Sequence, residues 1–109
     1  MSLFAQNVYI PDANFKWCLV VNPEINTNND TEIQLSEASA YSDTINCSGI
    51  NIFDLTGIEA FTALTYLNCS NNQISSLDIS QNSALTNLAC QSNNLTSLNL
   101  NGADALYEL

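Results

Sequence analysis

The stretch that decides the fold is Leu64-Thr65-Tyr66-Leu67-Asn68-Cys69-Ser70-Asn71-Asn72-Gln73-Ile74-Ser75-Ser76-Leu77-Asp78-Ile79. The chain repeats this pattern 21 residues later, from Leu85 to Leu100, with apolar residues and Cys90 in the same slots. An upstream match, offset by 22 residues, pairs Ile45, Cys47, Ile52 and Leu55 with Leu67, Cys69, Ile74 and Leu77. Apolar positions that recur at a period of this length indicate a solenoid of stacked coils.

Within one period the pattern is Leu-x-x-Leu-x-Cys-x-x-Asn-x-Ile/Leu, the signature of a leucine-rich repeat with cysteine in a leucine slot. The alternation at Leu67-Asn68-Cys69 predicts a short strand with Leu67 and Cys69 facing inward. Asn72 follows where the chain turns, and its side chain can pair backbone groups that the turn leaves open. Such a short period leaves no room for a full helix on the return, so we expect an extended segment or one 3₁₀ turn there. The predicted fold is therefore a leucine-rich repeat solenoid of β-rich, right-handed coils of 21–22 residues.

The chain divides into residues 1–43, which carry no repeat, and residues 44–109, which hold about three repeats. Asp12 predicts the N-cap of a helix that ends before Pro23. The inward stripe of that helix should be Phe15, Cys18 and Leu19, and the whole segment would form a helical cap over the first coil. A second short helix is expected from Ser36, as its cap, through Tyr41. Residues 44–109 show no C-terminal cap, because Ala103 stands where the preceding repeat has Asn82; we therefore expect an open apolar end.

Cys47, Cys69 and Cys90 occupy one repeat slot, so we expect them to stack as a column of buried, free thiols. Cys18 lies in the non-repetitive segment. It would instead bridge to Cys47 if the preceding helix covers the first coil. The cysteine spacing does not favour a zinc site.

Residues 26–37 have the spacing of a calcium-binding EF-hand loop, with oxygen side chains at the first, third, fifth and twelfth positions. Two positions depart from that pattern: the first ligand is a neutral Asn, and Thr31 replaces the glycine of the sharp turn. A loop that keeps the turn as structure, with Ile33 packed beneath it, is the main expectation; weak Ca²⁺ binding is the alternative. The candidate calcium ligands are Asn26, Asn28, Asp30, Glu32 and Glu37.

The composition excludes several classes of function. The formal net charge is −10, Lys16 is the only Lys or Arg, and there is no His. Such a chain cannot neutralise the phosphates of a nucleic acid or an anionic membrane surface. We expect no insertion into a membrane, because no apolar run is long enough to span one. Catalysis is not expected either, since the carboxylates are scattered and no histidine base is present.

Segments of the sequence resemble known classes of proteins. The phrase from Asn51 to Leu67, Asn-Ile-Phe-Asp-Leu-Thr-Gly-Ile-Glu-Ala-Phe-Thr-Ala-Leu-Thr-Tyr-Leu, is similar to the repeat phrase of internalins, bacterial surface proteins with a truncated EF-hand-like cap. The opening Val8-Tyr9-Ile10-Pro11-Asp12-Ala13-Asn14-Phe15-Lys16 and the Leu-x-Cys-Ser-x-Asn-x-Ile segment look like secreted leucine-rich repeat proteins of Bacteroidetes-type bacteria. The resemblance implies a secreted or cell-surface module that binds a protein or glycan through its concave sheet. No leader pattern is visible at Met1-Ser2-Leu3-Phe4, so a secreted protein would have its leader outside this sequence.

The outward residues of the predicted strands should line this concave face, with Tyr66 as the single aromatic candidate for a hot spot. A structural role is the alternative: the open last coil would pair with another chain, as in an end-to-end homodimer. The candidate binding residues are Thr44, Asn46, Ser48, Tyr66, Asn68, Ser70, Asn87, Ala89 and Gln91.

Overall fold

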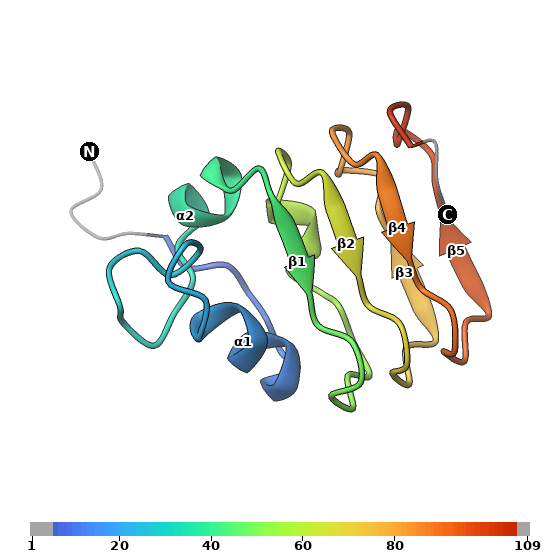
Figure 1. Ribbon diagram of the computed structural model, residues 1–109, viewed down its shortest axis with the longest axis horizontal. Coiled ribbons are helices and arrows are strands. Elements are labelled where there is room, and N and C mark those ends of the chain that lie inside the picture. The colour runs from blue at the N-terminus through green and yellow to red at the C-terminus, as the bar shows by residue number, and fades with distance from the viewer. Residues whose placement is uncertain (1–5, 107–109) are drawn as a thin grey trace.

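The computed structural model describes residues 6–106; residues 1–5, which include the opening considered for a leader, and residues 107–109 lie outside the described part. Two helices come first, α1 (Ala13–Val20) and α2 (Leu35–Ala40). Short strands and one 3₁₀ helix follow (Figure 1): β1 (Thr44–Asn46), η1 (Ile58–Ala60), β2 (Tyr66–Asn68), β3 (Ser76–Asp78), β4 (Asn87–Ala89) and β5 (Ser97–Asn99). Among the described residues, no helix is long and apolar enough to cross a lipid bilayer.

The strands form two parallel sheets, one in the order β1-β2-β4 and the other made of β3 and β5. Figure 1 shows the three-stranded sheet in front, with β3 behind it and the two helices beside β1. In the front sheet Ile45 lies opposite Leu67, and Leu67 lies opposite Leu88, so equivalent repeat positions stack. The predicted leucine-rich repeat solenoid with a short helical cap is therefore confirmed.

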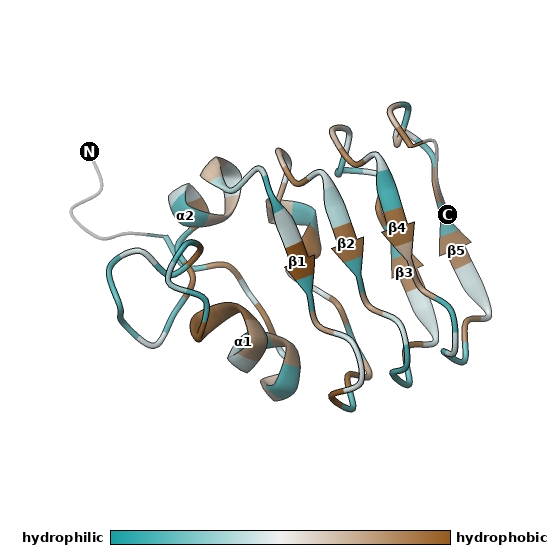
Figure 2. Cartoon of the chain, viewed as in Figure 1, coloured by the Kyte–Doolittle hydropathy of each residue, from teal (hydrophilic) through white to brown (hydrophobic). Residues whose placement is uncertain are grey.

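Apolar side chains of successive coils make a continuous core between the two sheets. Figure 2 shows the middle residue of β1, β2 and β4 as hydrophobic. Leu67 and Ile74 are fully buried, because each coil covers the apolar row of its neighbour. Leu77 in β3 is 2% exposed, whereas its register partner Leu98 in β5 is 39% exposed. No coil covers the outer side of Leu98 within residues 6–106, which leaves this end of the core partly open.

Asparagine side chains hold the turns of successive coils together. The amide nitrogen of Asn72 donates to the carbonyls of Cys47 and Cys69, both at 3.0 Å. Its Oδ1 accepts from the Ile52 amide, also at 3.0 Å. Asn93 repeats the arrangement one coil later and donates to the Cys69 carbonyl at 2.9 Å. This confirms the predicted asparagine ladder, in which one side chain joins the backbones of two coils.

The far side of the coils has an asparagine of its own. Asn82 is fully buried, and its amide nitrogen donates to the carbonyls of Ile58 and Phe61 at 2.9 and 3.0 Å. Both acceptors belong to the η1 segment of the preceding coil, which replaces the second strand there. The predicted strand-then-Asn arrangement thus joins neighbouring coils on both sides of the solenoid.

Asp12 begins α1, as predicted, and also fastens the helix to the first coil. Its Oδ1 accepts from the Phe15 amide at 3.0 Å. Its Oδ2 accepts from the Phe53 and Asp54 amides, at 2.9 and 3.2 Å. Phe15 and Leu19 are fully buried on the inward side of α1. One carboxylate therefore caps a helix and closes a loop about forty residues away in sequence.

The segment before α1 passes closely against Gly57. This glycine has a φ of +113°, and a Cβ at its position would lie 2.8 Å from Ile10 Cγ1 and 3.0 Å from the Tyr9 carbonyl oxygen. An L side chain would therefore meet both backbone strain and a backbone atom. Gly57 allows residues 8–10 to pack on the first coil.

The expected cap of the second helix was wrong. Ser36 lies within α2, and Gln34 is the N-cap residue. The Gln34 amide donates to Glu37 Oε1 at 2.9 Å, which ties the loop before the helix to its first turn. Ile33 is fully buried next to it, as predicted. The capping box between Gln34 and Glu37 starts the helix two residues earlier than expected.

The cysteines also required a correction. Cys18 and Cys47 form a disulfide with a Cα–Cα distance of 6.0 Å, so the expectation of a free Cys47 was wrong and the alternative pairing is the one observed. The physical reason is that Cys47 has no repeat before it, and α1 takes that place. Cys69 and Cys90 are free thiols, as predicted; Cys69 is buried, but Cys90 is only half-buried. Burial, with a contribution from the Cys90 thiolate, raises the pKa of Cys69 to about 12.

Candidate binding face

The outward residues of β1, β2 and β4 form one continuous face, called the sheet face here. The strand register places Thr44, Tyr66 and Asn87 in one row and Asn46, Asn68 and Ala89 in the next. The middle residue of each strand points into the core, so its neighbours point outward. Six of the nine predicted binding residues are therefore brought together.

Tyr66 is the largest side chain on the sheet face and lies in the middle of its row. It is 37% exposed, between Thr44 on one side and Asn87 on the other. Asn87 is itself hydrogen bonded, since its Oδ1 accepts from the Thr86 hydroxyl at 2.8 Å. The face therefore offers one aromatic ring among amides, hydroxyls and a methyl group.

Three predicted residues lie after the strands, and one of them was placed wrongly. Ser48 is half-buried and Gln91 is exposed, but Ser70 is only 3% exposed. The Ser70 hydroxyl donates to Asn68 Oδ1 at 2.7 Å, and the Ser70 amide donates to the same oxygen at 3.1 Å. Ser70 is buried because its hydroxyl is paired with Asn68 and its segment lies between two coils, to which it is hydrogen bonded through Gly49 and Gln91. It does not present its side chain to a partner.

Asn46 and Asn68 shape the turns as well as the sheet face. Asn68 Oδ1 is occupied by Ser70, and Asn46 Oδ1 accepts from the Ser48 amide at 3.3 Å. Both are asparagine turns of the kind in which a side chain pairs with the backbone two residues on. The recurring Asn-Cys-Ser sequence carries this signal. Asn68 Oδ1 already accepts two hydrogen bonds, so a partner would meet the amide hydrogens of that side chain.

An open hollow of about 340 Å³ adjoins the sheet face at the β1 margin; sequence reasoning missed it. We call it the acidic hollow, because three carboxylates line it. Two hydrogen bonds join its wall to the sheet: the Thr65 hydroxyl donates to the Ser42 carbonyl at 2.9 Å, and the Thr65 amide donates to the Asp43 carbonyl at 3.4 Å. Its lining residues are Glu24, Thr27, Ser36, Glu37, Ala40, Tyr41, Ser42 and Asp43.

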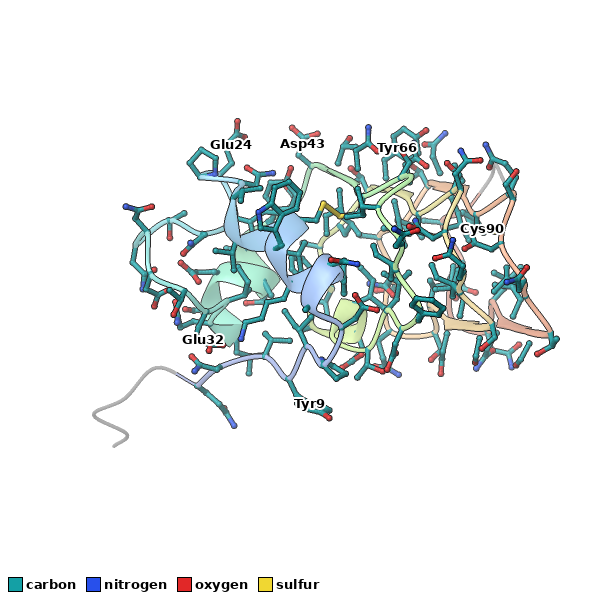
Figure 3. The ribbon with its side chains drawn as sticks, turned by 90° about the horizontal axis from the view of Figure 1, so that it is seen from below. Tyr9, Glu24, Glu32, Asp43, Tyr66 and Cys90 are labelled. Carbon is teal, nitrogen blue, oxygen red and sulfur yellow. A yellow bond between two sulfur atoms is a disulfide. The ribbon has the colours of Figure 1, made fainter. Side chains whose placement is uncertain are left out.

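The acidic hollow and the aromatic residue of the sheet share one side of the molecule. Figure 3 shows Glu24, Asp43 and Tyr66 projecting in the same direction, while Glu32 and Tyr9 lie on the opposite side. Burial raises the pKa of Tyr41 in the hollow, and the carboxylates of Asp43 and Glu24 add to the rise.

A second, smaller hollow of about 160 Å³ lies between η1 and β3, away from the sheet face. Its carboxylates serve their own turns. Glu59 accepts from the Gly57 amide at 2.9 Å, and Asp78 accepts from the Ser80 amide at the same distance. Hydrogen bonds from the Ser80 side chain and backbone amide lower the pKa of Asp78. This hollow offers acidic side chains without an aromatic neighbour from the sheet.

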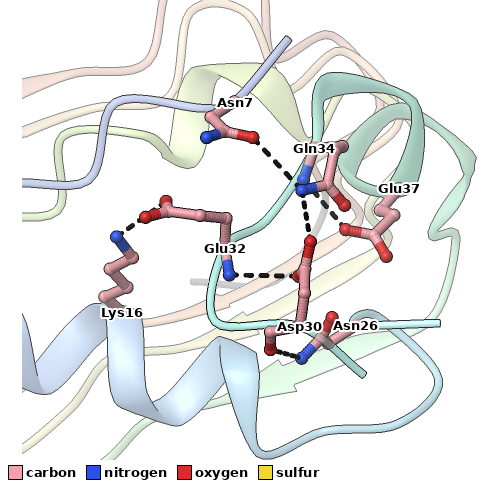
Figure 4. A network of polar contacts seen from close by, with 7 residues as sticks. All are labelled: Asn7, Lys16, Asn26, Asp30, Glu32, Gln34 and Glu37. Carbon is pink, nitrogen blue, oxygen red and sulfur yellow. Dashed lines mark hydrogen bonds and ion pairs between the residues drawn. The ribbon is translucent and has the colours of Figure 1, made fainter. Parts of the chain in front are cut away.

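The candidate calcium loop at residues 26–37 is closed by hydrogen bonds (Figure 4). Both oxygens of Glu37 accept backbone N–H groups: Oε2 from Thr27 at 2.9 Å and Oε1 from Gln34 at 2.9 Å. Asp30 Oδ2 accepts from the Gln34 side-chain amide at 2.9 Å, and Oδ1 accepts from the Glu32 amide at 3.1 Å. The Glu32 hydrogen bond is the main reason that the pKa of Asp30 is lowered.

The remaining candidate ligands also make contacts within the protein. Glu32 forms an ion pair with Lys16 at 2.7 Å. Asn26 is buried and donates to the Asp30 carbonyl at 2.7 Å, while its Oδ1 has no hydrogen-bond partner within the described residues. Asn28 donates its side-chain amide to Asp30 Oδ2 at 3.1 Å. In residues 6–106 no group of three His, Cys, Asp or Glu is arranged to hold a metal ion.

Comparison with known proteins places these features in context. No protein-family model matches the chain. Over 78 residues, or 71% of its length, it is 41% identical to internalin J of Listeria monocytogenes, and that match spans only 8% of the relative. The solved functional domain of internalin J, which includes a cysteine ladder, superposes with a TM-score of 0.79 at 35% identity and covers 99% of this chain and 24% of that one. Another Listeria monocytogenes internalin has a TM-score of 0.67 at 22% identity and covers 90% of this chain and 33% of its own.

Proposed function

Because the chain is an internalin-like leucine-rich repeat protein, homologous to internalin J, we propose that it is a non-catalytic module that recognises a protein, or a glycan, through the sheet face. The position of Tyr66 carries this proposal. Among residues 6–106 it is the only aromatic residue on the face. It lies in the central strand and is partly exposed, although its backbone is fixed on both sides. Tyrosine is among the residues that contribute most to binding at protein interfaces.

The absence of a histidine in the sequence supports a non-catalytic role. The carboxylates that line the smaller hollow accept backbone N–H groups in their own turns. A carboxylate that is fixed in a turn is poorly placed to transfer protons to a substrate. These observations favour recognition over chemistry.

The experiment that tests this function compares two substitutions on opposite sides of the coils. A partner is first selected from arrays of purified extracellular proteins and glycans, and its affinity is then measured by titration calorimetry. Tyr66→Ala should weaken binding at least about tenfold, because it removes the aromatic contact. Ser97→Ala, on the exposed β5 strand, is the matched control and should leave the affinity unchanged. Equal losses in the two variants would exclude the sheet face.

We further propose that the protein is secreted or displayed on a bacterial surface. The disulfide between Cys18 and Cys47 supports this, because such bridges persist in oxidising compartments and are rare in the cytosol. Purification from a bacterial periplasm should yield two free thiols per chain by mass spectrometry after alkylation. Four free thiols in that material would contradict the proposal.

A second candidate function is assembly through the last coil. The observation that favours it is the 39% exposure of Leu98, against 2% for Leu77 in the preceding coil. An end-to-end homodimer would cover this apolar end. Light scattering over a wide range of concentrations tests it: a mass that stays at one chain throughout would exclude self-association, whereas a Leu98→Asp variant should abolish any dimer that forms.

A further inference from the structure

We infer that the partner of the sheet face carries a basic peptide segment, with a lysine or arginine side chain seated in the acidic hollow. This inference rests on the proposed function and specifies the chemistry of the partner. Its basis is the pairing of an uncharged sheet face with a negatively charged margin on the same side of the molecule.

Charge complementarity identifies the partner. The chain has a formal net charge of −10, and its single cationic side chain, Lys16, is paired with Glu32 at 2.7 Å. Figure 3 shows Glu32 on the side away from the sheet face. No lysine or arginine therefore offsets Glu24 and Asp43 at the margin of the face. An acidic segment approaching this margin would be repelled, and a basic one would be attracted.

The hollow has the dimensions and position that a charged side chain requires. Its volume of about 340 Å³ falls at the lower end of the range of about 300–1,000 Å³ that is typical of ligand pockets. Glu24 and Asp43 are exposed, so their carboxylates can accept hydrogen bonds from an ammonium or guanidinium group. Glu37 is different, because both of its oxygens already accept backbone N–H groups.

The hollow is continuous with the sheet face, so one extended peptide can occupy both. Ser42 and Asp43 form part of its wall and accept hydrogen bonds from Thr65, the residue immediately before Tyr66. Thr44 follows Asp43 directly and lies opposite Tyr66 in the sheet. A peptide with a cation in the hollow would therefore lay its neighbouring residues across Thr44 and Tyr66.

The test uses two fluorescently labelled peptides, one of alternating lysine and glycine and one of alternating glutamate and glycine. Binding is measured by fluorescence anisotropy at an ionic strength of about 0.15 M. The lysine peptide should bind saturably, and the glutamate peptide should not. The double variant Glu24→Gln/Asp43→Asn should weaken the lysine peptide by about fivefold, the loss expected for two exposed ion pairs.

The matched control is Glu59→Gln/Asp78→Asn, which changes two carboxylates that line the smaller hollow. Each double variant raises the formal net charge from −10 to −8, so a diffuse charge effect would weaken both equally. The control should lose less than about twofold in affinity. Thermal denaturation of all variants establishes that each remains folded.

Two results would overturn the inference: equal losses in the two double variants, or no saturable binding of the lysine peptide at millimolar concentration. Either result leaves the proposed function standing if Tyr66→Ala still weakens a protein or glycan partner more than Ser97→Ala. If Tyr66→Ala and Ser97→Ala have equal effects while the lysine peptide still binds through Glu24 and Asp43, the hollow remains a binding site for basic side chains and the sheet face is excluded.

Discussion

Replacing Asn72 by alanine should destabilise the protein more than any other substitution of an asparagine in the repeats. Asn72 is 5% exposed, and its side chain takes part in five hydrogen bonds. Not all of the partners would be orphaned. The Cys69 carbonyl also accepts from Asn93 at 2.9 Å, and the Ser70 carbonyl also accepts from the Gly49 amide at 3.1 Å.

The remaining partners set the magnitude of the effect. The amides of Ile50 and Ile52 and the carbonyl of Cys47 would lose the bonds that Asn72 makes at 3.0–3.1 Å. A buried polar group left unpaired costs about 1–3 kcal/mol. Because Ile50 is only half-buried, water can reach part of this site, and we expect a total loss of about 3–5 kcal/mol. That is a large share of the roughly 5–15 kcal/mol that stabilises a domain of this kind.

Urea denaturation followed by circular dichroism measures this loss, with two comparison variants. Asn82→Ala removes bonds to the Ile58 and Phe61 carbonyls. Both carbonyls still accept from backbone amides, those of Phe61 and Leu64 respectively, so neither is orphaned and the cost should be about 1–2 kcal/mol. Asn94→Ala changes an exposed residue of the same type and should stay within about 0.5 kcal/mol of the parent. A change below about 1 kcal/mol for Asn72→Ala would refute the reasoning, since it would mean that the ladder is energetically neutral.

Four further outcomes are expected. Cys18→Ser opens a bridge between residues 29 apart in sequence and should lower the free energy of unfolding by about 3–4 kcal/mol, measured by urea denaturation under non-reducing conditions. Gly57→Ala should lower the melting temperature more than Gly49→Ala, because a Cβ meets neighbouring atoms at the first position and nothing within 4 Å at the second. The free energy of unfolding should fall as the pH rises from 9 toward 12. The reason is that the Cys69 thiol ionises in the unfolded state near its ordinary pKa of 9.0 but stays protonated in the folded state up to about 12. Cys69→Ala should remove that part of the dependence of the unfolding free energy on pH. Added Ca²⁺ should not raise the melting temperature, because N–H donors already occupy the carboxylates of the 26–37 loop. A clear increase would show that the loop binds calcium.

The repeat could be predicted from the sequence because its signals are local and periodic. Leu67 and Leu88 occupy the same slot, and a period of 21 residues places them on the same side of successive coils. Asn72 was identified as a turn residue for the same reason. The helix cap at Asp12 also follows from local sequence, since a capping side chain reaches only two or three residues along the chain.

The wrong predictions concern contacts that a pattern of alternating residues does not encode. Ser70 continues the outward alternation after Asn68, but its amide and hydroxyl both donate to Asn68 Oδ1 and its side chain is buried between neighbouring coils. The 26–37 loop was expected mainly as a structural element, and the oxygens of Glu37 accept N–H groups of that loop; calcium binding there stays a prediction.

The amino-acid sequence by itself determined the coil, its period, the inward residues and the asparagine ladder. The reason is that successive coils stack, so residues in the same position of neighbouring repeats become neighbours in space. Only the tertiary structure decided the partner of Cys47 and the meeting of Glu24 with Asp43 beside the sheet. Cys18 and Cys47 come from the cap and the first coil, which share no period, and Glu24 and Asp43 lie in different parts of the cap, which has no period of its own. Their proximity depends on how α1 packs on the coil, through contacts such as Asp12 with Phe53, and no spacing along the chain specifies that packing.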